Sequence, residues 1–151
     1  MSDIAEATAL QVAHRVRDGM WARDKACQAL GMRLVDVTPG RASLAMTVRE
    51  DMLNGHDLCH GGYITTLADS AFAYACNSYD ELTVASGLSI DFLAPARLGE
   101  TLTASAHEVS KAGRTGVYDV EVSNQNGVRI AIFRGRSHTF RGRPAVPQAK
   151  A

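Results

Sequence analysis

One acidic side chain stands in the middle of an apolar helical pattern. The stretch from Asn54 to Asn77 reads NGHDLCHGGYITTLADSAFAYACN, and Asp69 is its only acid after the two glycines. Solvated helix faces usually carry Lys, Glu and Arg, whereas this pattern contains no Lys or Arg. A carboxylate in such surroundings can act as a general base or a nucleophile, so Asp69 is a candidate catalytic residue. The alternative is a solvated charge on an exposed helix face.

Two glycines, Gly61 and Gly62, come directly before this pattern. The amino terminus of a helix has unpaired N–H groups and the positive end of the helix dipole, and glycine lets a ligand atom approach the backbone closely. This combination predicts an oxyanion-hole donor at the start of the helix. The alternative is that the glycines only permit a tight turn.

Helical spacing predicts one long helix from about His60 to Asn77 or Ser78, roughly 27 Å long at 1.5 Å per residue. The face expected to pack on a sheet is the stripe Ile64, Leu67, Ala68, Ala71, Phe72 and Ala75. The opposite face holds small side chains around the carboxylate: Gly62, Thr65, Thr66, Asp69, Ala73 and Cys76. We expect this small-residue face to press against another surface, such as a second subunit or a ligand.

Six segments around this helix have strand-like patterns with turn signals between them. They are residues 32–37, 42–48, 82–93, 100–109, 116–124 and 128–140. Consecutive antiparallel strands covered by the helix make an α+β protein. Residues 1–30 are predicted to be a helical segment broken at Gly19, residues 31–140 a single domain, and residues 141–151 a disordered tail.

Composition excludes several classes of protein. A chain of 151 residues, 46% of them hydrophobic, is expected to form one globular core. Sixteen basic and sixteen acidic residues give no net charge, so no nucleic-acid partner is expected. No apolar run could span a membrane and the amino terminus is acidic, so we expect a cytoplasmic protein without a membrane partner. Three cysteines without a CxxC pair argue against a disulfide framework.

Three segments resemble the hotdog-fold acyl-CoA thioesterases, most closely those of the phenylacetate pathway. They read NGHDLCHGGYITTLADSAFAYACNS, SIDFLAPARLGETLTA and GRTGVYDVEVSNQNGVRIAIFRGRSH, and the match covers roughly residues 30–140. The resemblance implies a hotdog fold, in which a curved antiparallel sheet of five to six strands wraps one long central helix. It also implies hydrolysis of aryl-acetyl-CoA thioesters, such as phenylacetyl-CoA or its ring-hydroxylated forms, with no cofactor because CoA is part of the substrate. A dimer that doubles to a homotetramer is the implied assembly.

The same resemblance assigns roles to individual residues. Asp69 corresponds to the catalytic carboxylate of the family, Gly61 to the backbone donor at the helix start, and Asn54 to the polar group before it. In related hotdog enzymes a Ser or Thr on the strand after the helix helps to hold water. Ser86 and Ser89 are both candidates for that position.

Helix geometry connects this chemistry to assembly. Gly61 and Asp69 are eight residues apart, about 12 Å along one helix axis, so they cannot act on one carbonyl within a chain. Two antiparallel helices packed by their small-residue faces would place Asp69 of one subunit opposite Gly61 and Asn54 of the other, giving two symmetric sites. The Gly61 N–H would bind the thioester carbonyl, while Asp69 activates water or attacks directly to give an anhydride.

The two ends of the substrate need further contacts. The CoA phosphates require cationic or N–H partners, and Lys111 and Arg114 are preferred because their loop adjoins the GVYDVEV strand. Other basic side chains that could serve are Arg97, Arg134 and Arg136. Aromatic walls for the acyl group are offered by Tyr63, Phe72 and Tyr74, with packing in the core as the alternative.

Other assignments have less support in the sequence. His56, Cys59, His60 and Asp69 match no common zinc spacing, so no metal is expected. Cys59 as a nucleophile lacks a recognised local signature, and His60 is expected to hydrogen-bond the loop or to lie near the thioester. Two rival functions are a hotdog enoyl-CoA hydratase or dehydratase, which generally needs a His paired with an acid, and a non-enzymatic acyl-CoA-binding protein, which should carry a DNA-binding segment.

Overall fold

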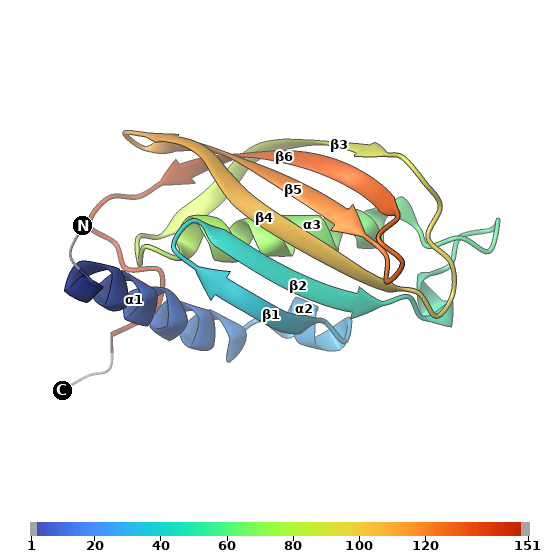
Figure 1. The fold of residues 1–151 in the computed structure, drawn as a ribbon, viewed down its shortest axis with the longest axis horizontal. Coiled ribbons are helices and arrows are strands. Elements are labelled where there is room, and N and C mark those ends of the chain that lie inside the picture. The colour runs from blue at the N-terminus through green and yellow to red at the C-terminus, as the bar shows by residue number, and fades with distance from the viewer. Residues whose placement is uncertain (1–2, 149–151) are drawn as a thin grey trace.

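A six-stranded antiparallel sheet wraps one long helix in the computed structural model, which describes residues 3–148 (Figure 1). The helix is α3 (Gly61–Asn77). The strands are β1 (Arg33–Thr38), β2 (Arg41–Thr47), β3 (Thr83–Phe92), β4 (Thr101–Ala112), β5 (Thr115–Ser123) and β6 (Arg129–Thr139). The other helices are α1 (Asp3–Trp21), α2 (Lys25–Ala29) and the 3-10 turn η1 (Glu50–Met52). The predicted α+β class and hotdog arrangement are confirmed.

The sheet closes over one face of α3, as the sequence pattern predicts. All six side chains of the predicted stripe are buried, from Ile64 to Ala75. The ring of Phe72 packs against Tyr118 of β5 and Phe133 of β6, with centroids 5.5 Å and 5.9 Å away. On β6, Gly135 makes room for this ring, because an added Cβ would lie 2.8 Å from it. Aromatic packing of this kind fixes the position of α3 under the strands.

The order of the strands is β1-β2-β4-β5-β6-β3, so the expectation that consecutive strands pair throughout is wrong. The chain leaves α3 and enters β3, which pairs with β6 from Thr83↔Thr139 to Phe92↔Ala131. β2 then pairs with β4 instead of β3. The alternation within each strand predicts which face is buried, but it does not specify the neighbouring strand. As a result β3 is an edge strand next to α3.

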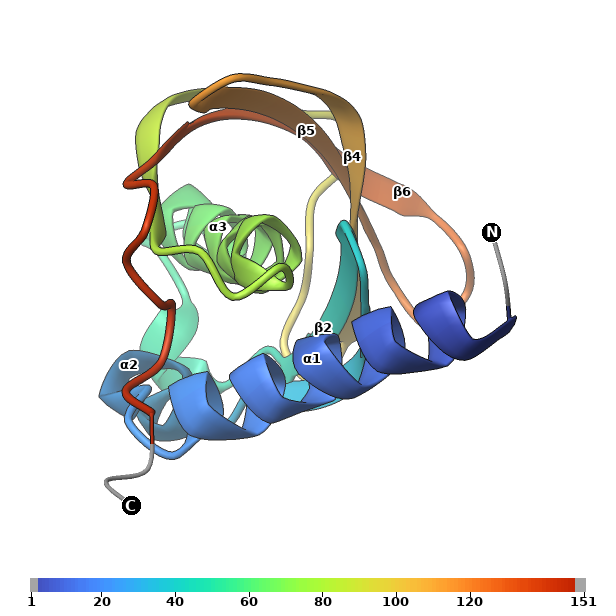
Figure 2. The same cartoon turned by 90° about the vertical axis from the view of Figure 1, so that its left-hand side faces the viewer.

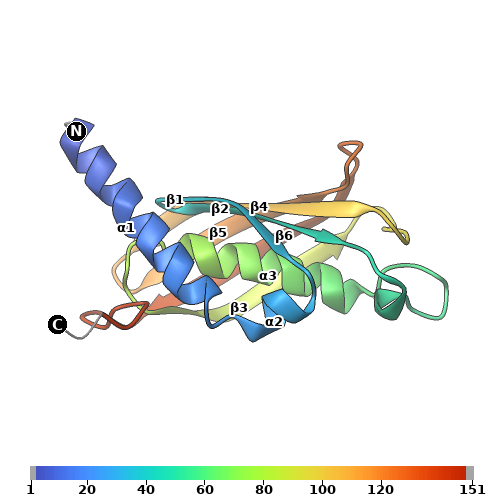
Figure 3. The ribbon, with the colours of Figure 1, turned by 90° about the horizontal axis from the view of Figure 1, so that it is seen from below.

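The amino-terminal helices lie below α3 in Figure 2, on the side that the sheet leaves open, and Figure 3 shows the same pair from beneath. α1 continues through Gly19 and ends at Trp21, so the predicted break at Gly19 is wrong. The interruption comes at residues 22–24 instead. There the side chain of Asp24 accepts a hydrogen bond of 3.1 Å from the Cys27 N–H and caps α2.

The carboxyl-terminal segment follows a defined path after β6, which differs from the expected disordered tail. The Leu82 N–H donates to the Arg143 carbonyl at 2.8 Å, and Val146 is only 5% exposed. Two prolines and the lack of periodicity correctly indicated no helix or strand, but they say nothing about packing against other elements. Residues 149–151 of the predicted tail, like residues 1–2 of the leading segment, lie outside the described residues. None of the helices within residues 3–148 is both long and apolar enough to cross a lipid bilayer.

Candidate active site

The amino terminus of α3 leaves one backbone donor free. His60 caps the helix, because its Nδ1 accepts a hydrogen bond of 3.0 Å from the Gly62 N–H and its carbonyl accepts one of 3.0 Å from the Tyr63 N–H. The Gly61 N–H has no acceptor among residues 3–148. His60 therefore has a capping role, while the Gly61 N–H points out of the helix end and can bind an oxygen atom.

The loop before α3 is fixed by Asn54. Its side-chain oxygen accepts hydrogen bonds from the N–H groups of His56 (2.9 Å) and Leu58 (3.2 Å), and its N–H donates to the Leu58 carbonyl at 2.8 Å. This side-chain turn holds the loop against the start of the helix. The amide nitrogen of Asn54 makes no hydrogen bond within the described part of the chain, so it is the group that can contact a substrate or water.

Asn54 and Gly61 border the same cavity, which has a volume of about 480 Å³. Its opposite wall is the end of β3, where Phe92 is 52% exposed. The Phe92 ring lies so close to the Gly61 backbone that an added Cβ would be 2.9 Å from its Cζ. A larger residue at position 61 would therefore displace the Phe92 ring, which glycine leaves in place. The sequence did not single out Phe92.

Asp69 lies on the same helix but borders a different cavity, of about 350 Å³, between α3 and β3. Its side chain is half-buried and makes no hydrogen bond or ion pair with any of residues 3–148. Loss of hydration through burial raises the pKa of the Asp69 carboxyl above its ordinary value. The surrounding walls are largely apolar, with Phe72 and Ala73 from α3 and Ala85 from β3. A carboxylate without a cationic partner in such a place can act as a base or a nucleophile, which keeps Asp69 a candidate catalytic residue.

The structure thus brings Asn54 and Gly61 together but keeps Asp69 apart from them within one chain. α3 is continuous from Gly61 to Asn77, so the spacing of about 12 Å between the donor and the acid stands. The small-residue face that joins the two cavities is partly open, since Thr65, Thr66 and Ala73 are only half-buried.

The comparisons with known proteins agree with this geometry. Residues 56–131 match the model of the thioesterase superfamily. The acyl-coenzyme A thioesterase PaaI of Escherichia coli is 48% identical over 123 residues, which are 82% of this chain and 88% of that protein. The chain belongs to the thioesterase superfamily.

Two solved structures superpose on this chain. The structure of the E. coli PaaI protein from the phenylacetic acid degradation operon matches with a TM-score of 0.87 and 44% identity, covering 89% of this chain and 98% of that one. The structure of smu.793 from Streptococcus mutans bound to acetyl-CoA matches with a TM-score of 0.71 and 28% identity, covering 74% and 90%.

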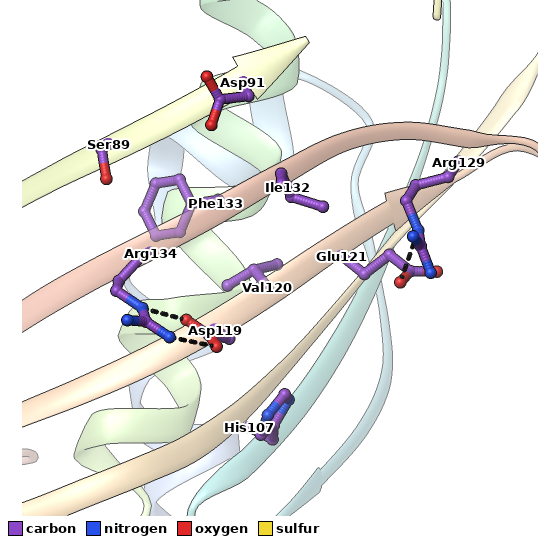
Figure 4. A pocket seen from close by; sticks show the side chains of 10 residues that line it. All are labelled: Ser89, Asp91, His107, Asp119, Val120, Glu121, Arg129, Ile132, Phe133 and Arg134. Carbon is purple, nitrogen blue, oxygen red and sulfur yellow. Dashed lines mark hydrogen bonds and ion pairs between the residues drawn. The ribbon is translucent and has the colours of Figure 1, made fainter. Parts of the chain in front are cut away.

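Neither serine candidate of this thioesterase-superfamily chain lies in the Asp69 cavity. The Ser86 hydroxyl sits at the irregular point of β3 and donates to the Arg136 carbonyl at 3.1 Å. Ser89 points to the outer face of the sheet, away from α3 (Figure 4). The part of β3 that borders the Asp69 cavity is Thr83, Val84 and Ala85. Within one chain neither serine borders the Asp69 cavity, and a water-holding role for Ser86 or Ser89 stays a prediction.

The two preferred CoA-binding candidates lie at the opposite end of α3 from Gly61. Lys111 places its Nζ 4.0 Å from the ring centroid of Tyr79, just beyond the carboxyl end of the helix. Arg114 is exposed in the adjacent turn between β4 and β5. Among the others, Arg134 is engaged in a two-pronged ion pair with Asp119 at 2.7 and 2.8 Å.

A third cavity, of about 390 Å³, lies on the outer face of the sheet and contains none of the three main candidates (Figure 4). Four of its charged side chains form two ion pairs, Arg134 with Asp119 and Arg129 with Glu121 at 2.9 Å, while Asp91 in the same lining is exposed. Because Asn54, Gly61 and Asp69 all lie outside this lining, we do not assign the reaction to this face.

The aromatic and sulfur side chains have mainly structural roles. Tyr74 is 1% exposed, and its hydroxyl donates to Asp24 at 3.0 Å, so it belongs to the core rather than to the acyl site. Burial raises the pKa of the Cys59 thiol to about 11, which keeps it protonated and disfavours a nucleophilic role. Within residues 3–148 no group of three or more His, Cys, Asp or Glu side chains is placed to hold a metal ion.

Proposed function

We propose that this protein is an acyl-CoA thioesterase that hydrolyses aryl-acetyl-CoA thioesters to the free acid and CoA. The observation that carries the proposal is that one helix, α3, presents an unpaired N–H at Gly61 and an unpaired carboxylate at Asp69. A thioester hydrolase needs both groups: a donor for the carbonyl oxygen and an acid side chain that acts on the carbonyl carbon. The superfamily and the name of the E. coli relative support the same chemistry.

The complete site forms between two copies of the chain. A partner α3 that runs antiparallel to the first places its Gly61 and Asn54 opposite Asp69, which makes two equivalent sites per dimer. The exposed edge of β3 supports this arrangement, since Val84, Leu88 and Phe92 are 43%, 39% and 52% exposed along it. Contact between two such edges would cover this apolar surface and close both cavities. The dimer doubles to a homotetramer.

The reaction begins when the thioester carbonyl accepts a hydrogen bond from the Gly61 N–H, which stabilises the negative charge that develops on its oxygen. The Asn54 amide nitrogen, held in place by the loop bonds of its own oxygen, orients the acyl end or the water. Asp69 of the other copy either removes a proton from water as it attacks the carbonyl carbon, or attacks directly and forms an anhydride that water then opens. In both routes the C–S bond breaks and CoA leaves as its thiol.

The dimensions of the Asp69 cavity favour a short or aromatic acyl group. Ligand pockets span about 300–1,000 Å³, and the cavity beside Asp69 is about 350 Å³, at the small end of this range. The relation to a protein from a phenylacetic acid degradation operon supports phenylacetyl-CoA or its ring-hydroxylated forms. Lys111 and Arg114 bind the phosphates at the outer end of the substrate, no cofactor takes part, and the enzyme works in the cytoplasm.

A thiol-release assay tests the proposal. The purified protein is supplied with acetyl, hexanoyl, palmitoyl, benzoyl, phenylacetyl and hydroxyphenylacetyl thioesters of CoA, and kcat/KM is measured for each. We expect the highest value for the aryl-acetyl thioesters and slower turnover of straight-chain groups of similar size, because these bury comparable apolar surface without aromatic contacts. An optimum at palmitoyl would contradict the substrate, and no release from any thioester would contradict the activity.

A further inference from the structure

The cavity beside Asp69 is bordered by two residues that come from opposite ends of the chain. Met20 at the end of α1 and Ala145 in the carboxyl-terminal segment both border it, together with walls from α3 and β3. Both residues lie outside the segment 56–131 that matches the superfamily model. The superfamily segment therefore supplies Asp69, while chain segments outside it complete the space around the acid.

Met20 is held in place by contacts of its neighbours with α3. The ring of Trp21 lies 6.4 Å from that of Tyr74, whose hydroxyl donates to Asp24. The Cys27 thiol donates to the Ser70 hydroxyl at 3.3 Å. These contacts attach the amino-terminal segment to α3 at Ser70 and Tyr74, within five residues of Asp69, so Met20 has a defined position at the cavity.

Ala145 is held by a separate set of contacts. Its N–H donates to the Asp80 side chain at 3.1 Å, and the other oxygen of Asp80 pairs with Arg15 of α1 at 2.8 Å. The next residue, Val146, packs directly on Gly19, where an added Cβ would lie 2.8 Å from a Val146 methyl group. Figure 2 shows the carboxyl-terminal segment descending past α3 toward α1. The two terminal segments thus support each other as one wall.

We propose that Met20 and Ala145 form the size-limiting wall of the acyl pocket, and that they determine the largest acyl group the enzyme accepts. The proposal rests on the proposed function, since it takes Asp69 as the group that acts on the thioester. Neither residue brings a polar side chain, so their contribution to the site is shape. Apolar pockets discriminate by volume, and one methylene group too many or too few changes kcat/KM by about 10–200-fold.

Enlarging the pocket is the first test. Met20→Ala should raise the ratio of kcat/KM for 1-naphthylacetyl-CoA to that for phenylacetyl-CoA by about tenfold or more, because the second ring gains the space that the Met20 side chain occupied. Met20→Val, a milder truncation, should move the ratio in the same direction by a smaller factor if Met20→Ala does not fold. Leu10→Ala is the matched control on α1, since Leu10 is exposed and does not border the cavity.

Filling the pocket from the other segment should have the opposite effect. Ala145→Leu should lower the ratio of kcat/KM for phenylacetyl-CoA to that for acetyl-CoA by about tenfold, while acetyl-CoA turnover changes little. Ala26→Leu, on the exposed side of α2, is the control for the same substitution. In the double variant Met20→Ala/Ala145→Leu the two changes should largely cancel, because both residues face one space.

The outcomes distinguish a failure of this inference from a failure of the proposed function. Suppose that the wild-type protein hydrolyses the panel, but both ratios stay within about twofold of wild type in folded Met20 and Ala145 variants. Met20 and Ala145 then do not limit the size of the acyl group, and the inference is wrong. A wild-type protein that releases no thiol from any of these thioesters would contradict the proposed function, and with it the assignment of this cavity as the acyl pocket.

Discussion

The two candidate catalytic groups on α3, the Gly61 donor and the Asp69 carboxylate, are positioned in different ways. At the amino end, the side chains of Asn54 and His60 hydrogen-bond residues at most four positions away. In the middle of the helix, the Asp69 side chain makes no hydrogen bond within residues 3–148, and its cavity is walled by residues as distant as Met20, Ala85 and Ala145. The side chains around the donor are thus held by local bonds, whereas the surroundings of the acid come from elements across the chain.

This difference explains why the two groups have opposite electrostatic character. A donor at a helix terminus needs no more than backbone geometry and the helix dipole. A reactive carboxylate needs a place with little water and no cation, which only tertiary packing can provide, and burial there raises the pKa of Asp69. One chain contains both groups but holds them about 12 Å apart along α3, so the proposed function requires a second copy to bring them together.

The largest expected effect comes from removing the acid. Asp69→Asn keeps the shape of the side chain but removes the base or nucleophile, so kcat/KM for phenylacetyl-CoA should fall by about 10²–10⁴-fold. Circular dichroism and light scattering should show an unchanged fold and assembly. Asp91→Asn, an exposed acid on the outer side of β3, is the control and should leave activity unchanged. Retention of more than about a tenth of wild-type kcat/KM by Asp69→Asn, about 1.4 kcal/mol of lost stabilisation, would remove Asp69 from the mechanism.

Mixed subunits test whether the two halves meet across an interface. Asp69→Ala chains and Asn54→Ala chains should each be nearly inactive, the second because its loop loses two hydrogen bonds to the Asn54 oxygen. Co-expression in equal amounts should restore about a quarter of wild-type activity, since half of the dimers are hybrids with one intact site of two. Activity equal to the sum of the separate variants, in a mixture shown by mass spectrometry to contain hybrids, would place both halves in the same chain.

A smaller loss is expected from crowding the donor end. The Cβ of Gly61→Ala would lie 2.9 Å from the Phe92 ring and push it into the shared cavity, so kcat/KM should fall by about tenfold. Phe92→Ala in the same chain should recover most of that loss by freeing space. Gly55→Ala is the matched control, because a Cβ at Gly55 meets no atom within 4 Å. If Phe92→Ala brings no recovery, contact with the ring is not the reason for glycine at position 61.

The sequence predicted the local features of the site and missed the distant ones. The limits of α3, its buried stripe and the six strand segments follow from periodicity, and the structure confirms them. The predicted pairing of β3 was wrong, because alternation within a strand does not specify its neighbour. The predicted helix break at Gly19 was also wrong, because that glycine instead makes room for Val146, which is 127 residues away. Met20 and Ala145 could not be assigned to Asp69, since no local pattern encodes a contact across the length of the chain.

The smallest expected effect concerns stability, and it depends on pH. Because burial raises the pKa of Asp69 in the folded protein above its unfolded value near 3.9, the folded state binds this proton more tightly. Its free energy of unfolding therefore falls as pH rises from about 4 through the raised pKa, and stays lower above it.

Asp69→Asn has no such proton, so urea denaturation at pH 7 should show a higher free energy of unfolding than wild type. The difference should shrink toward zero as the pH is lowered below about 3.9, where the carboxyl is neutral in both the folded and the unfolded protein. Asp91→Asn should show no comparable gain, because its carboxylate is exposed. A difference in free energy of unfolding between Asp69→Asn and wild type that does not change with pH would mean that the Asp69 carboxylate is fully solvated. The electrostatic contrast between this carboxylate and the Gly61 donor would then be wrong.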